Sequence, residues 1–406
     1  GLIGYTEHGG TLKDVWVKNT PINSADWYVG GVLGRGVMTL SNVHNVGSNV
    51  SGHQYTGGLV GEQHRNITGS GATGSVTGTY HTGGLVGNLG DYTVANSFAT
   101  GNVEALASRH GNGSYVGGLI GKTGSATLTD SYATGNVKGP WDSVGGLIGQ
   151  SDGGLTLTRV SASGNVNGNR NIGGLVGYAV WGATINNSSY SGSTPRTIDY
   201  NGGKADGIAG GLVGYAGQSV NINSSWVGPV TIQSHYQAAG LIGYTQDRAY
   251  VNDSYVSNAS ITGGEGTAGL VGMAKGGTWI SRSYAGGSSG TAVTGGNFVG
   301  GLAGEMVGAG YIVDSYFAGA VTGSSSYGGL VGLLMPGAYL SNSYYNINAS
   351  LINGQARLTM GGLYSGQYTA WQASHATLAS RSLTITNYFS AADGDSYYSI
   401  ASNNNV

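Results

Sequence analysis

One short phrase, Gly-Gly-Leu-Val-Gly, returns along most of the chain and limits its fold more than any other feature. The leucine position of this phrase and its close variants gives twelve marks, at residues 2, 32 (a valine in this copy), 59, 85, 119, 147, 175, 212, 241, 270, 302 and 330. Most successive marks lie close to 28 to 30 residues apart. A fixed period of this length is typical of an array in which each repeat packs on its neighbours. The longer intervals predict loop insertions.

A second phrase lies between the marks and contains a Ser-aromatic pair. It is complete at residues 96–103 (Asn-Ser-Phe-Ala-Thr-Gly-Asn-Val) and 130–137 (Asp-Ser-Tyr-Ala-Thr-Gly-Asn-Val). Shorter copies occur at residues 253–255, 282–285, 314–316 and 342–344. Because both phrases recur in the same order, we expect each period to form one structural unit.

The repeats have the residue composition of short strands and turns. They are rich in Val, Ile, Thr and Tyr, and Gly, Asn and Ser bound them. No window keeps a glycine-free apolar face at helical spacing for three turns. We therefore predict an all-β fold, a single-stranded parallel β-helix (β-solenoid) of about twelve coils with a period near 28 to 30 residues. Each coil would hold two or three short strands, and the rod would be about 55 to 60 Å long.

The leucine of each repeat is the expected core residue. In a narrow coil it can stack on the leucines above and below, and burying one such side chain stabilises the fold by roughly 1.5 to 3 kcal/mol. The flanking glycines would either turn a corner with positive φ or let backbone layers approach closely. Gly58→Val and Gly174→Val should therefore destabilise the fold strongly. Asn and Ser near the corners suit turns and, in a stack, side-chain ladders.

Composition excludes several classes of protein and partner. Glycine supplies 80 residues and proline only 5, without a Gly-X-Y triplet repeat, so the chain is not collagen. Charged residues make up 8% and the net charge is −2, so we expect no nucleic-acid partner. The chain has no cysteine, and no apolar run is long enough for membrane insertion. Residue 1 already lies inside a repeat, which favours a piece of a longer protein.

The repeat pattern ends towards the C-terminus. We assign residues 1–345 to the solenoid repeats and residues 346–406 to an irregular or capping segment that alternatively begins a following module. Residues 382–388 alternate like a strand, and residues 396–400 are the candidate start of that module. A solenoid needs its open end covered, because exposed strand edges pair with other chains.

At its two phrases the chain resembles the GLUG-motif repeat family, whose signature is Gly-Leu-any-Gly followed by a Ser-Tyr-Ala-Thr-Gly-like strand. The resemblance covers about residues 1–345. Such repeats occur in filamentous haemagglutinin-like bacterial adhesins and in the non-catalytic repeats of IgA-cleaving metallopeptidases. The resemblance implies a secreted or cell-surface bacterial protein with an adhesive or spacer role, and a glycan or protein receptor on host cells or matrix. Residues 397–400 also resemble the opening of the next block in such mosaic proteins.

Motifs that carry chemistry elsewhere have a structural interpretation here. No histidine pair has the His-Glu-x-x-His spacing of a zinc peptidase. Residues 69–74 match a dinucleotide glycine pattern without a strand-to-helix context, and residues 121–123 resemble a phosphate loop whose leading glycine is replaced by Val116. Residues 286–290 match a nucleophile elbow, but a glycine-serine loop is the simpler interpretation. We assign no catalytic, cofactor-binding or metal site.

Four weaker candidates for binding remain. Asp393 and Asp395 form the nearest carboxylate cluster and are candidate calcium ligands, although such sites need six to eight oxygens. Asn-x-Ser/Thr triplets at Asn66 and Asn258 are glycan acceptors or chance occurrences. Threonine pairs at residues 127–129, 156–158 and 384–386 do not recur at every coil, which disfavours ice binding. Tryptophans outside the ladder are either sugar-stacking platforms or covers for coil edges: Trp27, Trp141, Trp181, Trp226, Trp279 and Trp371.

The predicted function is that of a non-catalytic adhesin or rigid spacer rod in a large secreted bacterial surface protein. The first alternative is a self-assembling extracellular fibre, in which the solenoid end near Gly1 meets the strand at residues 382–388 of a neighbour. The second alternative is a carbohydrate-active β-helix enzyme. It is disfavoured because Asp and Glu together number 18 and form no cluster on one repeat face.

Overall fold

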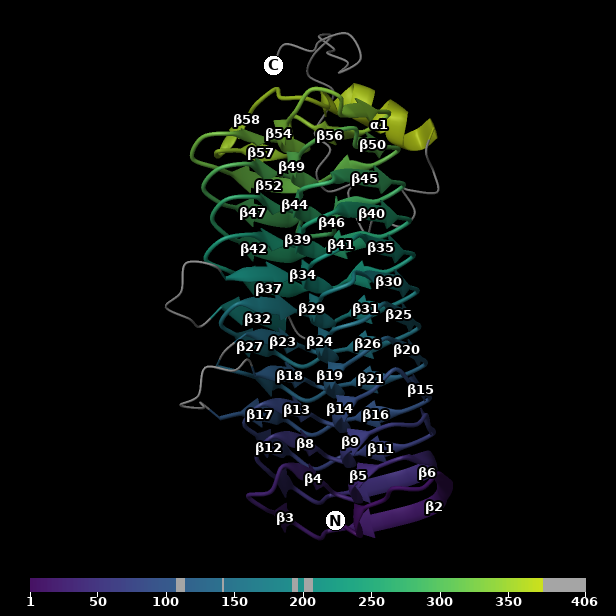
Figure 1. The fold of residues 1–406 in the computed structure, drawn as a ribbon. Coiled ribbons are helices and arrows are strands. Elements are labelled where there is room, and N and C mark those ends of the chain that lie inside the picture. Colours follow the sequence, from purple (N-terminus) through teal and green to yellow (C-terminus); the bar gives the residue numbers. More distant parts are fainter. Residues whose placement is uncertain (107–113, 141, 192–195, 201–206, 375–406) are drawn as a thin grey trace.

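The structure is a computed structural model that describes residues 1–106, 114–140, 142–191, 196–200 and 207–374. Short parallel strands stack coil upon coil into a rod, with the N-terminus at one end and the last described residues at the other (Figure 1). The rod has about 11 turns with a period near 29 residues. The expected all-β parallel solenoid is confirmed.

One coil contains five strands, not the two or three expected from the sequence. In the coil that begins at His81 these are β13 (His81–Gly83), β14 (Val86–Leu89), β15 (Thr93–Ala95), β16 (Phe98–Ala99) and β17 (Val103–Ala105). Glycines at the corners and the left-handed residue Asn96 between β15 and β16 interrupt this coil, so its strands have only two to four residues. The expectation was wrong because each phrase contains a bend that divides it into two strands.

Each strand pairs with its equivalents in the coils before and after it, which produces four sheets. They run as follows: sheet A from β1 (Ile3–Tyr5) to β54 (Val331–Leu334), sheet B from β2 (Gly10–Lys18) to β59 (Gly362–Leu363), sheet C from β3 (Ile22–Asn23) to β58 (Gln355–Ala356), and sheet D from β4 (Tyr28–Gly30) to β53 (Tyr327–Gly328). The chain passes through them in the order D, A, B, C. Sheet B has two ladders, a first that contains β15 and a second that contains β16.

Longer intervals between the marks come from insertions between strands, as expected. The interval from Leu85 to Leu119 has its extra residues between β17 and β18 (Tyr115–Gly117). The interval from Leu175 to Leu212 has them between β31 (Ser189–Tyr190) and β33 (Ile208–Gly210). Strand pairing continues unchanged across both places, because His81 still pairs with Tyr115 and Asn171 with Ile208.

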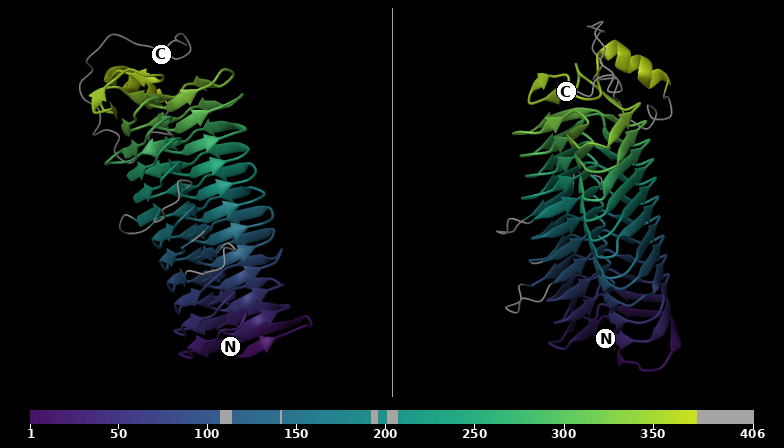
Figure 2. Two further views of the ribbon diagram at one scale, coloured as in Figure 1. Left: turned by 60° about the vertical axis from the view of Figure 1, so that its left-hand side comes forward. Right: turned by 45° about the horizontal axis from the view of Figure 1, so that its top comes forward.

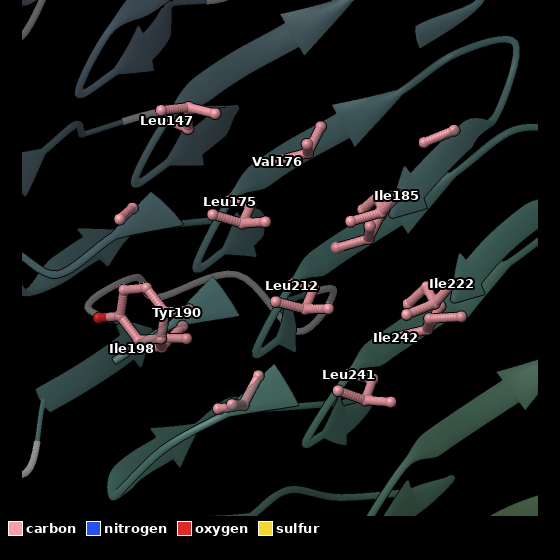
Figure 3. Packing of buried hydrophobic residues seen from close by; sticks show 14 of the residues in the cluster. Leu147, Leu175, Val176, Ile185, Tyr190, Ile198, Leu212, Ile222, Leu241 and Ile242 are labelled. Carbon is pink, nitrogen blue, oxygen red and sulfur yellow. The ribbon is translucent and has the colours of Figure 1, made fainter. Parts of the chain in front are cut away.

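The marked leucines form the core, as expected. From Val32 to Leu330 every marked side chain is 0% exposed, and Figure 3 shows Leu147, Leu175, Leu212 and Leu241 one above another. Leu2 is the exception at 61% exposed, because it lies in the first coil and has no described coil beyond it. Valine and isoleucine from the other sheets complete the interior.

Close backbone approach, rather than positive φ, explains the glycines of the main phrase. Gly58 and Gly174 are not among the residues with positive φ. A Cβ atom added to Gly58 would overlap with the carbonyl oxygen of Gly84 in the next coil and lie 2.9 Å from the Ala72 Cβ. A Cβ added to Gly174 would overlap with the carbonyl oxygen of Gly211 in the next coil and lie 2.5 Å from Cγ of Tyr190 in its own coil. The main phrase therefore needs glycine because successive coils touch there.

Positive φ instead marks the bend between the two ladders of sheet B. All twelve residues of this column have φ between +46° and +57°: Asp14, Asn42, Gly69, Asn96, Asp130, Arg159, Asn187, Ser224, Asp253, Arg282, Asp314 and Asn342. Asn, Asp and Gly tolerate this conformation best, which explains why they dominate the column. The second phrase of the repeat therefore encodes a bend.

A ladder of buried serines follows this bend and confirms the expected side-chain ladder. The backbone N–H of Ser225 donates to Oγ of Ser254 at 3.1 Å, and the Ser254 hydroxyl donates to the carbonyl of Asn252 at 2.7 Å. The same pattern runs from Ser70 to Ser343, and Val160 interrupts it in one coil. Each hydroxyl satisfies a buried backbone amide of the coil before it.

The C-terminal end departs from the repeat. Strand β57 (Leu351–Ile352) still pairs in parallel with β52 (Gly319–Thr322), but β58 turns back antiparallel to β57. The helix α1 (Ser365–Ser374) then lies over the side of sheet B, seen near the C-terminal end in Figure 2. Among the described residues no helix is long and apolar enough to cross a membrane.

Candidate functional site

The second ladder of sheet B carries a column of aromatic side chains on its outer face. Tyr255, Tyr284 and Tyr316 follow one another in β41 (Tyr255–Ser257), β46 (Tyr284–Gly286) and β51 (Tyr316–Phe317). Their ring centroids are 5.0 and 4.8 Å apart, and their planes differ by 3° and 4°. Because each ring covers the face of the next, this column stabilises the stack and leaves little ring surface for a ligand.

The helix α1 covers the C-terminal part of that column. Trp371 lies against the ring of Tyr344, with centroids 5.2 Å apart, and its Nε1 donates to Oδ1 of Asn342 at 2.7 Å. Tyr368 packs beneath it, and complete burial raises the pKa of its phenol. The chain itself therefore occupies this surface.

A second set of outward side chains lines the seam between sheets D and A. Near the N-terminus, Nε of Arg35 lies 2.6 Å from Oε2 of Glu62, and Asn88 donates to Oε1 of the same carboxylate at 3.0 Å. The guanidinium of Arg35 also lies over the ring of Tyr28, 5.2 Å from its centroid. The buried carboxylate of Glu62 is thus paired within the stack, which is the arrangement expected of a structural ion pair.

His81 continues the seam between two tyrosines. Its ring centroid is 4.9 Å from that of Tyr55 and 5.1 Å from that of Tyr115. Burial, aided by the charge of Lys122, lowers the pKa of His81 to about 3. The imidazole is therefore neutral at physiological pH, and it stacks on the ring of Tyr115 and meets the ring of Tyr55 edge to face.

Trp181 differs from all of these aromatic residues. It occupies the corner between β29 (Val176–Ala179) and β30 (Ala183–Asn186), where sheet A turns into sheet B, and it is 65% exposed. Two depressions, of about 580 and 570 Å³, lie on either side of it and share Ser125, Gly154 and Trp181 in their linings. Among the described residues no aromatic ring stacks on this indole.

The other sequence-predicted tryptophans divide between exposed and packed positions. Trp27 is 58% exposed in the first coil. Trp226 stacks on Tyr255 and Trp279 on Tyr250, with centroids 5.9 and 5.0 Å apart, so both belong to ladders. Trp371 lies on α1, and Trp141 lies outside the described residues. Among the five of these tryptophans that the structure describes, Trp27 and Trp181 present a largely exposed indole.

The glycine motifs are parts of coils. Residues 69–74 contain a bend residue and the strand β11 (Gly71–Ala72), and Lys122 and Thr123 lie in β19 (Ile120–Thr123). Residues 287–290 form an insertion at the corner before β47 (Thr291–Thr294). The interpretation of this last motif as a glycine-serine loop is confirmed.

The remaining candidates have structural contacts or lie outside the described residues. Oδ1 of Asn66 accepts the Thr93 amide at 3.0 Å, and Oδ1 of Asn258 accepts the Ser289 amide at 2.8 Å. Residues 127–129 and 156–158 are stacked partners in sheet B. Asp393, Asp395 and residues 382–388 and 396–400 lie outside the described residues. Within the described part of the chain no group of three or more His, Asp or Glu is placed to hold a metal ion.

Comparison with known protein families identifies the repeat. The GLUG motif matches residues 78–104 and 112–138. The chain contains GLUG repeats. The first match runs from β13 to β17 and the second from β18 to β22 (Val137–Lys138), so each GLUG motif corresponds to one coil of the solenoid. Comparisons with curated proteins and with solved structures gave no match.

Sequence reasoning missed the interactions that join one GLUG coil to the next on the outside. The Arg35–Glu62 pair and the His81 stack involve residues about one period apart, at positions where the residue type changes from coil to coil. No single repeat reveals them, because the two partners lie in different repeats. An alignment of the repeats on the marks would have placed Tyr55, His81 and Tyr115 in one column.

Proposed function

We propose that this GLUG solenoid is a non-catalytic rod in a secreted bacterial surface protein, acting as an adhesin or as a rigid spacer. The unbroken stacking carries the proposal. Hydrogen-bonded ladders join every coil to the next, and irregular residues are placed at corners, where they do not interrupt the ladders. About 11 turns at a rise of about 4.8 Å each give a rod of about 53 Å. Such a body holds whatever it carries at a fixed distance from its base.

The low net charge of the rod supports a role in binding a receptor or in spacing. Several acidic side chains face a cation of an adjacent coil, as in the pairs Asp130–Arg159 and Asp253–Arg282. With a net charge of −2, the rod has little field to attract nucleic acid. We therefore propose a protein or glycan receptor on host cells or in the matrix as the partner.

Adhesion of coated beads to cells tests the adhesin role, and small-angle scattering tests the rod. Beads that carry the purified chain should be retained on epithelial cells or on matrix proteins several-fold more than blocked beads. The scattering profile should fit a stiff rod of the expected length. An intact rod without retention reduces the role to that of a spacer, and a flexible profile contradicts both roles.

A further inference from the structure

The corner at Trp181 combines an exposed indole with a shallow, polar surface. The neighbouring coils place small residues at the same corner, namely Gly124, Ser125, Gly153, Gly154 and Ser219. A Cβ atom added to Gly154 would meet no atom within 4 Å, so the space beside the indole is open. Because these neighbours are small, the indole ring projects from the surface of the corner. Packing within the coil does not account for an indole at this position, since 65% of it is in solvent.

Hydrogen-bonding groups surround the ring on both sides. Asp91, Ser125 and Asp152 line the depression towards the N-terminus. Thr156, Thr184, Gln218 and Asn221 line the one that continues onto sheet B. Together the two linings span five successive coils, which is about 19 Å at a rise of about 4.8 Å per coil. The surface is therefore elongated along the rod.

We propose that this surface binds a neutral oligosaccharide, with one sugar ring stacked on Trp181. A pyranose has an apolar C–H face that suits an indole, and hydroxyls around its edge that suit amides, hydroxyls and carboxylates. The length of the surface fits several sugar units. This inference rests on the proposed adhesin role and names the ligand class of that role.

The charges of the surface select a neutral sugar over an acidic one. Nζ of Lys122 lies 2.7 Å from Oδ2 of Asp152, so this lysine is already paired with a carboxylate. Asp91 accepts the backbone amide of Ser125 through Oδ1, and a carboxylate has further acceptor sites. The Lys122–Asp152 pair is neutral overall, so Asp91 leaves the surface negative, which would repel a sialic or uronic acid, and both carboxylates can accept bonds from neutral hydroxyls.

The test uses the whole chain on an array of neutral oligosaccharides of two to six units, with sialylated and uronate-containing oligosaccharides beside them. Neutral oligosaccharides should bind, and longer ones should bind more tightly up to about four or five units, one per coil. Trp181→Ala should weaken binding on the order of tenfold or more, because stacked aromatic residues dominate such contacts. Trp181→Tyr should retain part of the affinity.

Trp27→Ala is the matched control, since Trp27 is similarly exposed in the first coil, far from the two depressions. It should leave binding unchanged. Both exposed tryptophans can be removed without a cavity, so the variants should melt like the parent chain. The inference is overturned if no neutral oligosaccharide binds, if acidic ones bind better, or if Trp181→Ala binds as tightly as the parent.

Bead adhesion separates failure of this inference from failure of the adhesin role. If Trp181→Ala beads are retained as well as parent beads, adhesion uses another surface and only the oligosaccharide site is refuted. If parent beads are not retained on any cell or matrix, the adhesin role itself fails.

Discussion

Replacing Gly174 by alanine tests the claim that the glycines of the main phrase are required by coil-to-coil contact. The added Cβ would overlap with the backbone carbonyl oxygen of Gly211 in the next coil, and it would lie 2.5 Å from Cγ of Tyr190 in its own coil, whereas ordinary contact begins at 3.4 Å. The backbone of the next coil must therefore move away, and the ring must retreat by about 0.9 Å (3.4 − 2.5 Å). Tyr190 is fully buried, and its hydroxyl donates to the carbonyl of Gly164 at 2.7 Å. A shift of that size is enough to break the hydrogen bond.

The expected cost combines two effects. Inserting a methyl group into a packed core costs about 1 to 3 kcal/mol, and losing a buried hydrogen bond costs about 1 kcal/mol more. Gly174→Ala should thus lower the free energy of unfolding by about 2 to 4 kcal/mol. Gly174→Val and Gly58→Val should lower it further, since they add larger side chains against the same carbonyls.

Gly154→Ala is the matched control, because its Cβ would meet open space one coil away. It should change the free energy of unfolding by less than about 0.5 kcal/mol. Denaturant melts compare the variants, and hydrogen exchange shows whether the loss begins at the coil of Gly174, because repeat arrays do not always unfold as one unit. Equal midpoints for Gly174→Ala and Gly154→Ala would refute the contact argument.

Three further variants test the outer and inner ladders. The folded pKa of His81, about 3, lies below its usual value of 6.5, so its contribution to stability is present above pH 6.5 and is lost as the pH falls towards 3. His81→Tyr should remove that part of the acid sensitivity, and parallel pH profiles of the two proteins would contradict it. Ser254→Ala removes two hydrogen bonds of the serine ladder and should lower the free energy of unfolding by about 1 to 3 kcal/mol in denaturant melts. The control Ser288→Ala, at an exposed corner, should change it very little, and equal losses for the two variants would argue against the ladder. Trp371→Ala should loosen α1 and speed proteolysis there while the solenoid core keeps its hydrogen-exchange protection; unchanged cleavage would show that the helix does not depend on this contact.

The core was predictable from the sequence because its geometry repeats. Every coil must place one apolar side chain at the same internal position, so Leu85, Leu119 and Leu147 recur at a readable spacing. The glycines beside them recur for the same reason, since each one meets the backbone of the next coil. The strand count was wrong because the bend at Asn96 or Asp130 lies inside what the residue types indicate as a continuous β segment.

The outer surface was not predictable in the same way, because its positions are not bound to one residue type. In the seam column Tyr55, His81, Tyr115 and Ser143 occupy equivalent places, but the His81 ring meets Tyr55 edge to face, stacks on Tyr115, and is followed by a serine. The contacts in this column depend on which side chains are neighbours in successive coils. Identifying those neighbours requires the register of one coil on the next. Trp181 was nevertheless a candidate from the sequence, because it lies outside the repeated apolar positions.

Departure from the repeat is where a function of this rod has to be sought. Every coil packs on its neighbours in the same way. A residue of the same type as its equivalents in the neighbouring coils is therefore explained by stacking alone. At the corner of Trp181 the preceding coil has Gly153 and the following coil Gln218, and no packing need calls for an indole between them. Such an exposed ring adds nothing to the stack and costs solvation of apolar surface. A role in binding gives this residue a physical reason that the solenoid does not supply.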